Sequence, residues 1–164
     1  MLKWIGAACV LGGGFLARWR SISALRRQEE TLEELTNLLE RMLREIRMTR
    51  MPLPRLLARL SRDGRFTGDL FAAAAEAAGL GGDLEAVWRR EAMALPLPAP
   101  ARRMTAELAS GLLGDEEGVC RAISLTSEGL SAQLARLRAL RPDSEKRTTA
   151  LCLSGAALLV ILLI

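Results

Sequence analysis

The chain has 164 residues, half of them hydrophobic, and it carries a formal net charge of +4 with no histidine. A length of this order supports a single core, and the absence of histidine removes the commonest general base and metal ligand. Its three cysteines are too few for a disulfide framework or a thiolate metal site. Composition therefore indicates a non-enzymatic protein, and we expect neither a cofactor nor a metal.

Both ends of the chain are apolar and uncharged. The stretches WIGAACVLGGGFLA (4–17) and TTALCLSGAALLVILLI (148–164) approach the length of about 20 residues that a membrane-spanning helix needs. A cleaved signal peptide is the alternative for the first stretch, but RWRS follows it where a small-residue cleavage site would stand. We therefore predict transmembrane helices at 1–19 and 147–164, flanking a domain at 20–146.

Positive charge lies on the domain side of both apolar stretches. The flanking basic residues are Arg18, Arg20, Arg26 and Arg27 after the first stretch and Arg138, Arg141, Lys146 and Arg147 before the second. Only Lys3 and the amino terminus lie on the other side of the first stretch. The positive-inside rule then predicts a cytoplasmic domain with both termini outside the membrane.

The first helix predicted for the domain has apolar residues at three-and-four spacing, close to the a/d seam of a coiled coil. The seam consists of Ile22, Leu25, Leu32, Leu35, Leu39, Met42 and Ile46. It is suited to pairing with a second copy of the chain, which would give a homo-oligomer. Packing on other helices of the same domain is the commoner use of such a seam.

Prolines, glycines and capping residues divide the chain after this helix into shorter helices. A second helix is expected from Pro52, which suits a first turn, to the pair Asp63-Gly64. Thr67 is predicted to cap a third helix that closes at Gly79. Asp83 is predicted to cap a short fourth helix.

The second half of the domain is also predicted to be helical. The proline-rich segment 96–100 is expected to be a non-helical surface connection. A helix over about 102–113 should end at Gly114, and a long one should run from about 116 until Pro142 stops it. The expected fold is thus all-α, a cytoplasmic bundle of about six helices between two transmembrane helices.

A search for catalytic or ligand-binding motifs nominates no active site. Cys120 has no general base near it in the sequence. The acidic run 115–117 lacks the spacing of a calcium loop and suits the positive end of a helix instead. The glycine-rich turn 79–83 lacks the Lys and Ser/Thr of a phosphate-binding loop.

One segment of the chain is unusually rich in arginine. Between Arg41 and Arg65 there are eight arginines and two acids. Six of them recur with helical spacing on either side of the Pro52 turn: Arg41, Arg44, Arg47, Arg55, Arg59 and Arg62. They predict a basic face suited to anionic lipid headgroups, nucleic acid or an acidic protein surface. Nucleic acid is not expected, because aromatic residues do not interleave with the arginines. A solvated helix face is the alternative.

Several packing motifs, in order along the chain, resemble the stage III sporulation protein AB family of endospore-forming bacteria. They are the opening MLKWIGA, Leu43-x-Glu45-Ile46, the turn Met51-Pro52-Leu53, Trp88, the stretch Gly111-Leu112-Leu113-Gly114 and the Leu/Ile-rich end. The resemblance covers essentially the whole chain.

The resemblance implies a membrane component of the channel-like complex that links mother cell and forespore during engulfment. The family's soluble domain is similar to inner-membrane platform proteins of type II secretion and type IV pilus machines, which sit beside a cytoplasmic ATPase. The implied partners are a secretion-type ATPase and other membrane components of the channel, with the domain facing the mother-cell cytosol from the outer forespore membrane. We expect the region Arg41–Arg65 to dock the ATPase. The alternative is a membrane-anchored adaptor that oligomerises through its first long helix.

Overall fold

A computed structural model describes the backbone of residues 2–49 and 51–163, and the side chains of residues 23–49 and 51–139. All regular elements in these ranges are α-helices, so the predicted all-α bundle of about six helices is confirmed for this part of the chain. The helices are α1 (Leu2–Thr49), α2 (Leu53–Asp63), α3 (Gly68–Leu80), α4 (Leu84–Ala94), α5 (Ala99–Gly111) and α6 (Glu116–Leu163).

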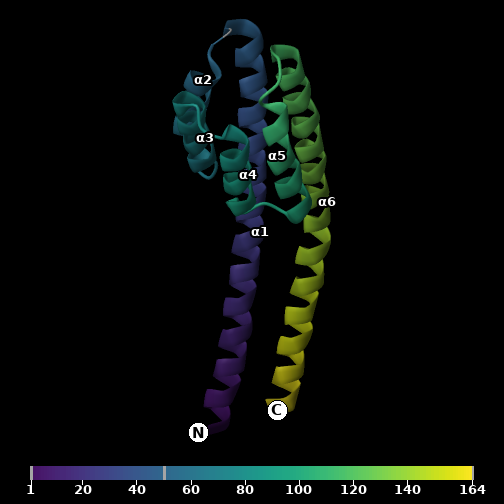
Figure 1. The fold of residues 1–164 in the computed structure, drawn as a ribbon. Helices are drawn as coiled ribbons and strands as arrows, with labels where there is room; N and C mark the ends of the chain where they lie inside the picture. Colours follow the sequence, from purple (N-terminus) through teal and green to yellow (C-terminus); the bar gives the residue numbers. More distant parts are fainter. Residues whose placement is uncertain (1, 50, 164) are drawn as a thin grey trace.

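The two long helices α1 and α6 form the axis of the molecule (Figure 1). They run antiparallel and side by side, and the two chain termini lie at the same end. The four short helices surround the other half of the pair, with α2 packed on α3, α3 on α4, α4 on α5 and α5 on α6. We call the end of the domain nearer the termini basal and the opposite end distal.

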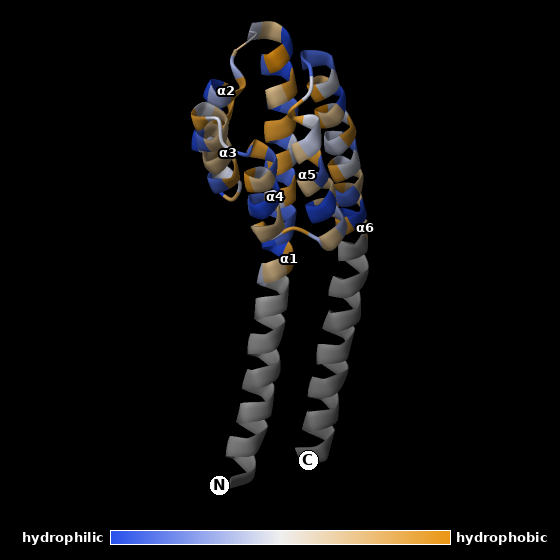
Figure 2. Cartoon of the chain, in the orientation of Figure 1, coloured by the Kyte–Doolittle hydropathy of each residue, from blue (hydrophilic) through white to orange (hydrophobic). Residues whose placement is uncertain are grey.

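The core is built around the predicted apolar seam of α1. Leu32, Leu35, Leu39 and Met42 are fully buried, whereas Leu25 is 54% exposed. The four buried residues belong to one hydrophobic cluster with side chains from α2 to α6. Hydrophilic residues occupy other positions on the same helices (Figure 2). Packing of the seam inside its own domain is therefore confirmed from Leu32 to Met42.

Two short helices follow the predictions closely. α2 begins directly after Pro52 and ends at Asp63, and the backbone N–H of Gly64 still donates to the carbonyl of Leu60 at 3.2 Å. The N-cap of α4 is Asp83, whose Oδ1 accepts a hydrogen bond from the backbone N–H of Ala86 at 2.9 Å. In both cases a local signal suffices to set the boundary.

The boundaries of α3 differ from the prediction. Thr67 precedes the helix, but its side chain makes no cap hydrogen bond to α3. Its hydroxyl instead donates to a carboxylate oxygen of Glu34 on α1. The helix also continues past Gly79 and ends at Gly81, which has a φ of 69°. This left-handed backbone is the conformation that favours glycine and closes a helix.

The prediction that segment 96–100 is non-helical was wrong at its end, since α5 starts at Ala99. Pro98 is the N-cap of α5, and Pro100 lies in its first turn. Backbone N–H groups in the first turn have no acceptor within the helix, so a proline, which lacks this N–H group, removes no helical hydrogen bond there. Leu97 is only 1% exposed, so the connection also contributes to the core. The helix ends at Gly111, short of the predicted Gly114.

The predicted stop at Pro142 was also wrong, because α6 continues as one helix to Leu163. An internal proline removes one helical hydrogen bond and costs about 3 kcal/mol, but a helix can absorb that cost. The long packing of α6 along α1 favours continuation over the local preference of the proline.

The predicted transmembrane helices at 1–19 and 147–164 lie outside the residues with described side chains. Among the residues that are described, none of the helices combines the length and the apolar character needed to cross a bilayer. The boundaries of the domain at 20–146 stay a prediction.

Candidate partner-binding surface

Helix α2 separates its leucines from its arginines. Leu56, Leu57 and Leu60 are buried against the core, and Arg55 and Arg59 are exposed. Arg62 is exposed as well. This division follows from the i, i+3, i+4 spacing of the leucines, which places the arginines on the outer face.

Half of the nominated arginines make ion pairs within the domain. Arg41 Nη1 lies 2.6 Å from Asp63 Oδ2, which joins α1 to the end of α2. Arg59 Nη1 lies 3.5 Å from Glu45 Oε1 and makes a second link between these helices. Arg44 Nη1 is 3.9 Å from Glu40 Oε2 on the same helix. The arginines of these pairs are at least partly exposed to solvent, so each pair contributes little stability, about 0–1 kcal/mol. The pairs still offset part of the positive charge.

The remaining three, Arg47, Arg55 and Arg62, form no ion pair within the described part of the domain. Arg47 lies apart from the other two. It is two residues from Glu45, or about 200° around the helix, so it faces away from the Arg59 pair on α2. The six arginines therefore do not form one continuous basic face, and the unpaired charge on α2 belongs to Arg55 and Arg62.

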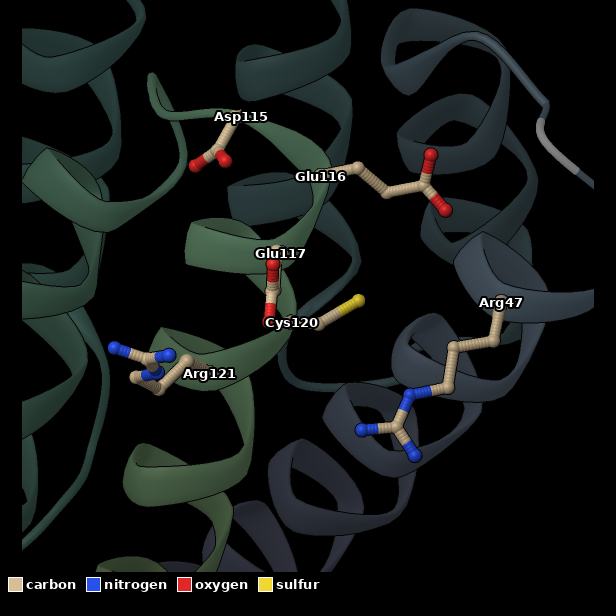
Figure 3. A pocket seen from close by; sticks show the side chains of 6 residues that line it. All are labelled: Arg47, Asp115, Glu116, Glu117, Cys120 and Arg121. Atoms are coloured by element: carbon tan, nitrogen blue, oxygen red, sulfur yellow. The ribbon is translucent and has the colours of Figure 1, made fainter.

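Arg47 lines an open depression of about 720 Å³ between the distal ends of α1 and α6. Figure 3 shows Glu116 and the sulfur of Cys120 on the side of α6 that faces Arg47. Asp115 and Arg121 lie on the other side of α6 in the same view. The depression thus mixes both charges, and it does not extend the basic surface of α2.

Sequence patterns did not identify the contact made by Glu34. Its Oε1 accepts hydrogen bonds from the backbone N–H groups of Phe66 and Thr67, at 2.9 and 3.0 Å, and from the Thr67 hydroxyl at 2.7 Å. A carboxylate from α1 thereby binds the N–H groups just before α3, where the helix dipole favours negative charge. The partners are more than 30 residues apart, so no local pattern signals the contact.

A second long-range contact joins the basal parts of α1 and α6. Arg138 Nε lies 3.2 Å from Glu29 Oε1, and Arg138 Nη2 lies 2.8 Å from Glu33 Oε2. The hydrogen bonds that the guanidinium donates to Glu33, and then to Glu29, raise the pKa of Arg138 above its usual value. In the sequence, Arg138 appeared only as a flanking charge.

The profile of the stage III sporulation protein AB family matches residues 3–164. The chain belongs to the stage III sporulation protein AB family. The resemblance seen in the sequence is thereby confirmed. A solved structure of a stage III sporulation protein AB (SpoIIIAB) is similar, with a TM-score of 0.63 at 17% sequence identity. The similarity covers 71% of this chain and 98% of that one, and at this identity it concerns the fold. No curated protein matches the sequence.

The structure gives packing reasons for two of the motifs that resemble the family. Trp88 is fully buried, and its ring meets that of Phe71 edge-on, with the centroids 5.6 Å apart. Gly111 lies where α5 closely approaches α6, and a Cβ atom there would be 2.4 Å from the Cβ of Ala122. Both motifs therefore serve the core of this family member.

The described part of the chain contains no group of three or more His, Cys, Asp or Glu side chains placed to hold a metal ion. Cys120 is buried and not disulfide-bonded. The exposed arginines of α2 are suited to charged contacts with another molecule. That this protein is not an enzyme stays a prediction.

Proposed function

We propose that this protein is a non-enzymatic membrane platform component of the complex that links mother cell and forespore during endospore formation. In this role it spans the outer forespore membrane twice and presents its helical domain to the mother-cell cytosol. There the domain docks a secretion-type ATPase, next to other membrane components of the channel. Membership of the stage III sporulation protein AB family supports the sporulation role.

The arrangement of the long helices supports the two-span anchor. α1 and α6 run side by side to termini at the same end of the molecule (Figure 1). Two spans at 1–19 and 147–164 would then enter the bilayer next to each other. The two apolar stretches and their flanking positive charges favour the same orientation.

The observation that carries the docking proposal is the unpaired positive charge of Arg55 and Arg62. Both side chains are exposed on α2, whose leucine face is buried in the core. No acid of the described domain pairs with either of them. Such arginines keep their full electrostatic attraction for an acidic partner, and Arg is the basic residue best suited to bidentate contacts with carboxylates.

Charge reversal at these two positions tests the docking directly. The full chain carrying Arg55→Glu and Arg62→Glu, reconstituted in lipid nanodiscs, should lose at least about tenfold in affinity for the ATPase, since each reversal replaces attraction by repulsion. Arg121→Glu, the same change at an exposed arginine of α6, is the matched control and should bind as wild type. Unchanged binding by the double variant, with unchanged helicity, would refute docking through α2.

The burial of the seam weighs against the alternative, an adaptor that oligomerises through its first long helix. Leu32, Leu35 and Leu39 are fully buried in the domain's own core, so a second copy could reach them only after the domain opened. Leu25 alone among the described seam residues is more than half exposed. A mass for the full chain that rises with concentration, and falls on Leu25→Ser, would favour the alternative.

A further inference from the structure

Two turns between helices lie at the basal end of the domain. The α2–α3 turn (64–67) and the α4–α5 connection (95–98) both face the end toward which α1 and α6 run to the termini (Figure 1). Glu34 of α1 holds the first of these turns, and the Arg138 contact with Glu33 and Glu29 lies on the terminal side of it. We define the basal surface as residues 23–33, 64–67, 95–103 and 134–139.

The basal surface carries unpaired positive charge. Five of its arginines are exposed and take part in no ion pair with the described residues: Arg26, Arg27, Arg65, Arg103 and Arg136. Of its acids, Glu29 and Glu33 bind Arg138, which leaves Glu30 as an exposed acid without an ion pair among the described residues. Arg102 is directed back into the domain, where its Nη2 donates to the carbonyl of Leu97 at 3.3 Å. The net charge available to a partner is therefore positive.

The distal end carries charges of both signs. Asp115 stands just before α6 there, Glu116 and Glu117 begin the helix, and all three are exposed near Arg47 and Arg121. The basal surface thus has an excess of unpaired positive charge that the depression at the distal end lacks. An anionic surface therefore attracts the basal surface of the domain.

The turn 64–67 adds a feature that suits an interface between water and lipid. The Arg65 guanidinium carbon lies 5.2 Å from the centroid of the Phe66 ring, which is half-buried. This cation–π contact presents a charged group and an aromatic edge together. Amphipathic pairs of this kind fit the headgroup region, where aromatic rings and arginines are both accommodated.

We infer that the basal surface binds anionic phospholipid headgroups, using Arg26, Arg27, Arg65, Arg103 and Arg136. The lipid contact rests on the membrane anchoring proposed above and adds to it a docking surface on the domain itself. The predicted first span ends at residue 19, and the helical rise places Arg26 about 10 Å beyond it. That is close to the screening length of about 8 Å at physiological ionic strength, so Arg26 and Arg27 act on the headgroups. The turn 64–67, which Glu34 holds, lies about 22 Å beyond the span and is the outer limit of the basal surface.

Hydrogen exchange on the full chain in nanodiscs tests this contact without the ATPase. We expect the amides of 64–67 and 95–98 to exchange more slowly in nanodiscs containing phosphatidylglycerol than in purely zwitterionic ones. The distal turn 112–115 should exchange equally in both. High salt should remove the difference, because screening weakens charge–headgroup attraction.

Neutralisation of three arginines supplies the matched comparison. The variant Arg65→Gln, Arg103→Gln, Arg136→Gln should lose the lipid-dependent protection, since each arginine contributes about fivefold to attraction at an anionic surface and three contribute on the order of a hundredfold. The variant Arg47→Gln, Arg55→Gln, Arg121→Gln removes the same charge away from the basal surface and should keep the protection.

The outcomes separate the lipid contact from the proposed function. A chain that enters nanodiscs but exchanges identically in both lipids would overturn the lipid contact and leave the ATPase platform intact. A chain that does not co-elute with nanodiscs would contradict the membrane anchor and the lipid contact together. Equal loss of protection in both triple variants would show a nonspecific effect of charge and would also overturn the lipid contact of the basal surface.

Discussion

The indole Nε1 of Trp88 donates a hydrogen bond to the backbone carbonyl of Thr105 at 2.7 Å and thereby joins α4 to α5 inside the core. Both residues are fully buried, so neither group can turn to water instead. A buried Trp needs such a partner for its N–H, and here the partner comes from the next helix in the chain. The short helix α4 is thus fixed in the core by one specific polar contact as well as by packing.

Trp88→Phe should destabilise the domain by about 1–3 kcal/mol, because it removes this hydrogen bond and part of the buried ring. Urea unfolding of the full chain in detergent, followed by circular dichroism, measures the change. Leu113→Ala, at a side chain that is 60% exposed, is the control and should have little effect. Equal stability of Trp88→Phe and wild type would contradict the role assigned to the indole.

Glu34→Gln should loosen the start of α3. The substitution keeps the size of the side chain but replaces charge-assisted hydrogen bonds by weaker neutral ones, at a cost of about 1–2 kcal/mol. Hydrogen exchange should become faster at Phe66 and Thr67, whose N–H groups bind the carboxylate. Glu30→Gln, one turn earlier on α1 and exposed, should leave these amides unchanged. Identical exchange of these amides in the two variants would contradict the role of the Glu34 carboxylate in binding them.

Gly111→Ala should destabilise the domain by about 1–3 kcal/mol, because the new methyl group overlaps Ala122. Adding Ala122→Gly should recover part of that loss, which a thermal unfolding series of the two single variants and the double variant would show. Gly79→Ala is the control, since nothing lies within 4 Å of the added atom. It should be neutral or slightly stabilising in a helix. Strictly additive effects at 111 and 122 would contradict the close approach.

Arg138→Gln should lower the unfolding temperature, and the difference from wild type should shrink at high salt, because the guanidinium and Glu33 are half exposed to solvent, although Glu29 is buried. The folded-state pKa of Arg138 is raised, so its contribution is present at every pH below the unfolded-state pKa and is lost only as pH rises through the folded value. The difference in unfolding temperature should therefore be equal at neutral pH and at about pH 10. A difference that disappears at the higher pH would contradict this assignment.

Local signals predicted much of the fold. The Pro52 start of α2, the Asp83 cap of α4 and the buried seam from Leu32 to Met42 each depend on neighbours within a few residues. Predictions failed where distant parts of the chain decide. Thr67 has the side chain of a cap, yet its hydroxyl binds Glu34 on another helix.

The candidate site shows the same limit. Helical spacing correctly placed Arg55, Arg59 and Arg62 on the outer face of α2. It could not reveal that Arg59 pairs with Glu45, or that Arg41 pairs with Asp63 22 residues away, because those contacts depend on how α2 folds back along α1. Only the structure separates the paired arginines from the unpaired ones.

Site-specific photocrosslinking in sporulating cells tests the ATPase platform most directly. A photoreactive amino acid replaces Ala58, an exposed α2 residue between Arg55 and Arg62, in the full chain; the control replaces exposed Ala86 on α4. The account predicts an adduct with the ATPase from position 58 and none from position 86. An ATPase that copurifies with the chain but forms no adduct from position 58, or forms one only from position 86, would contradict docking through α2.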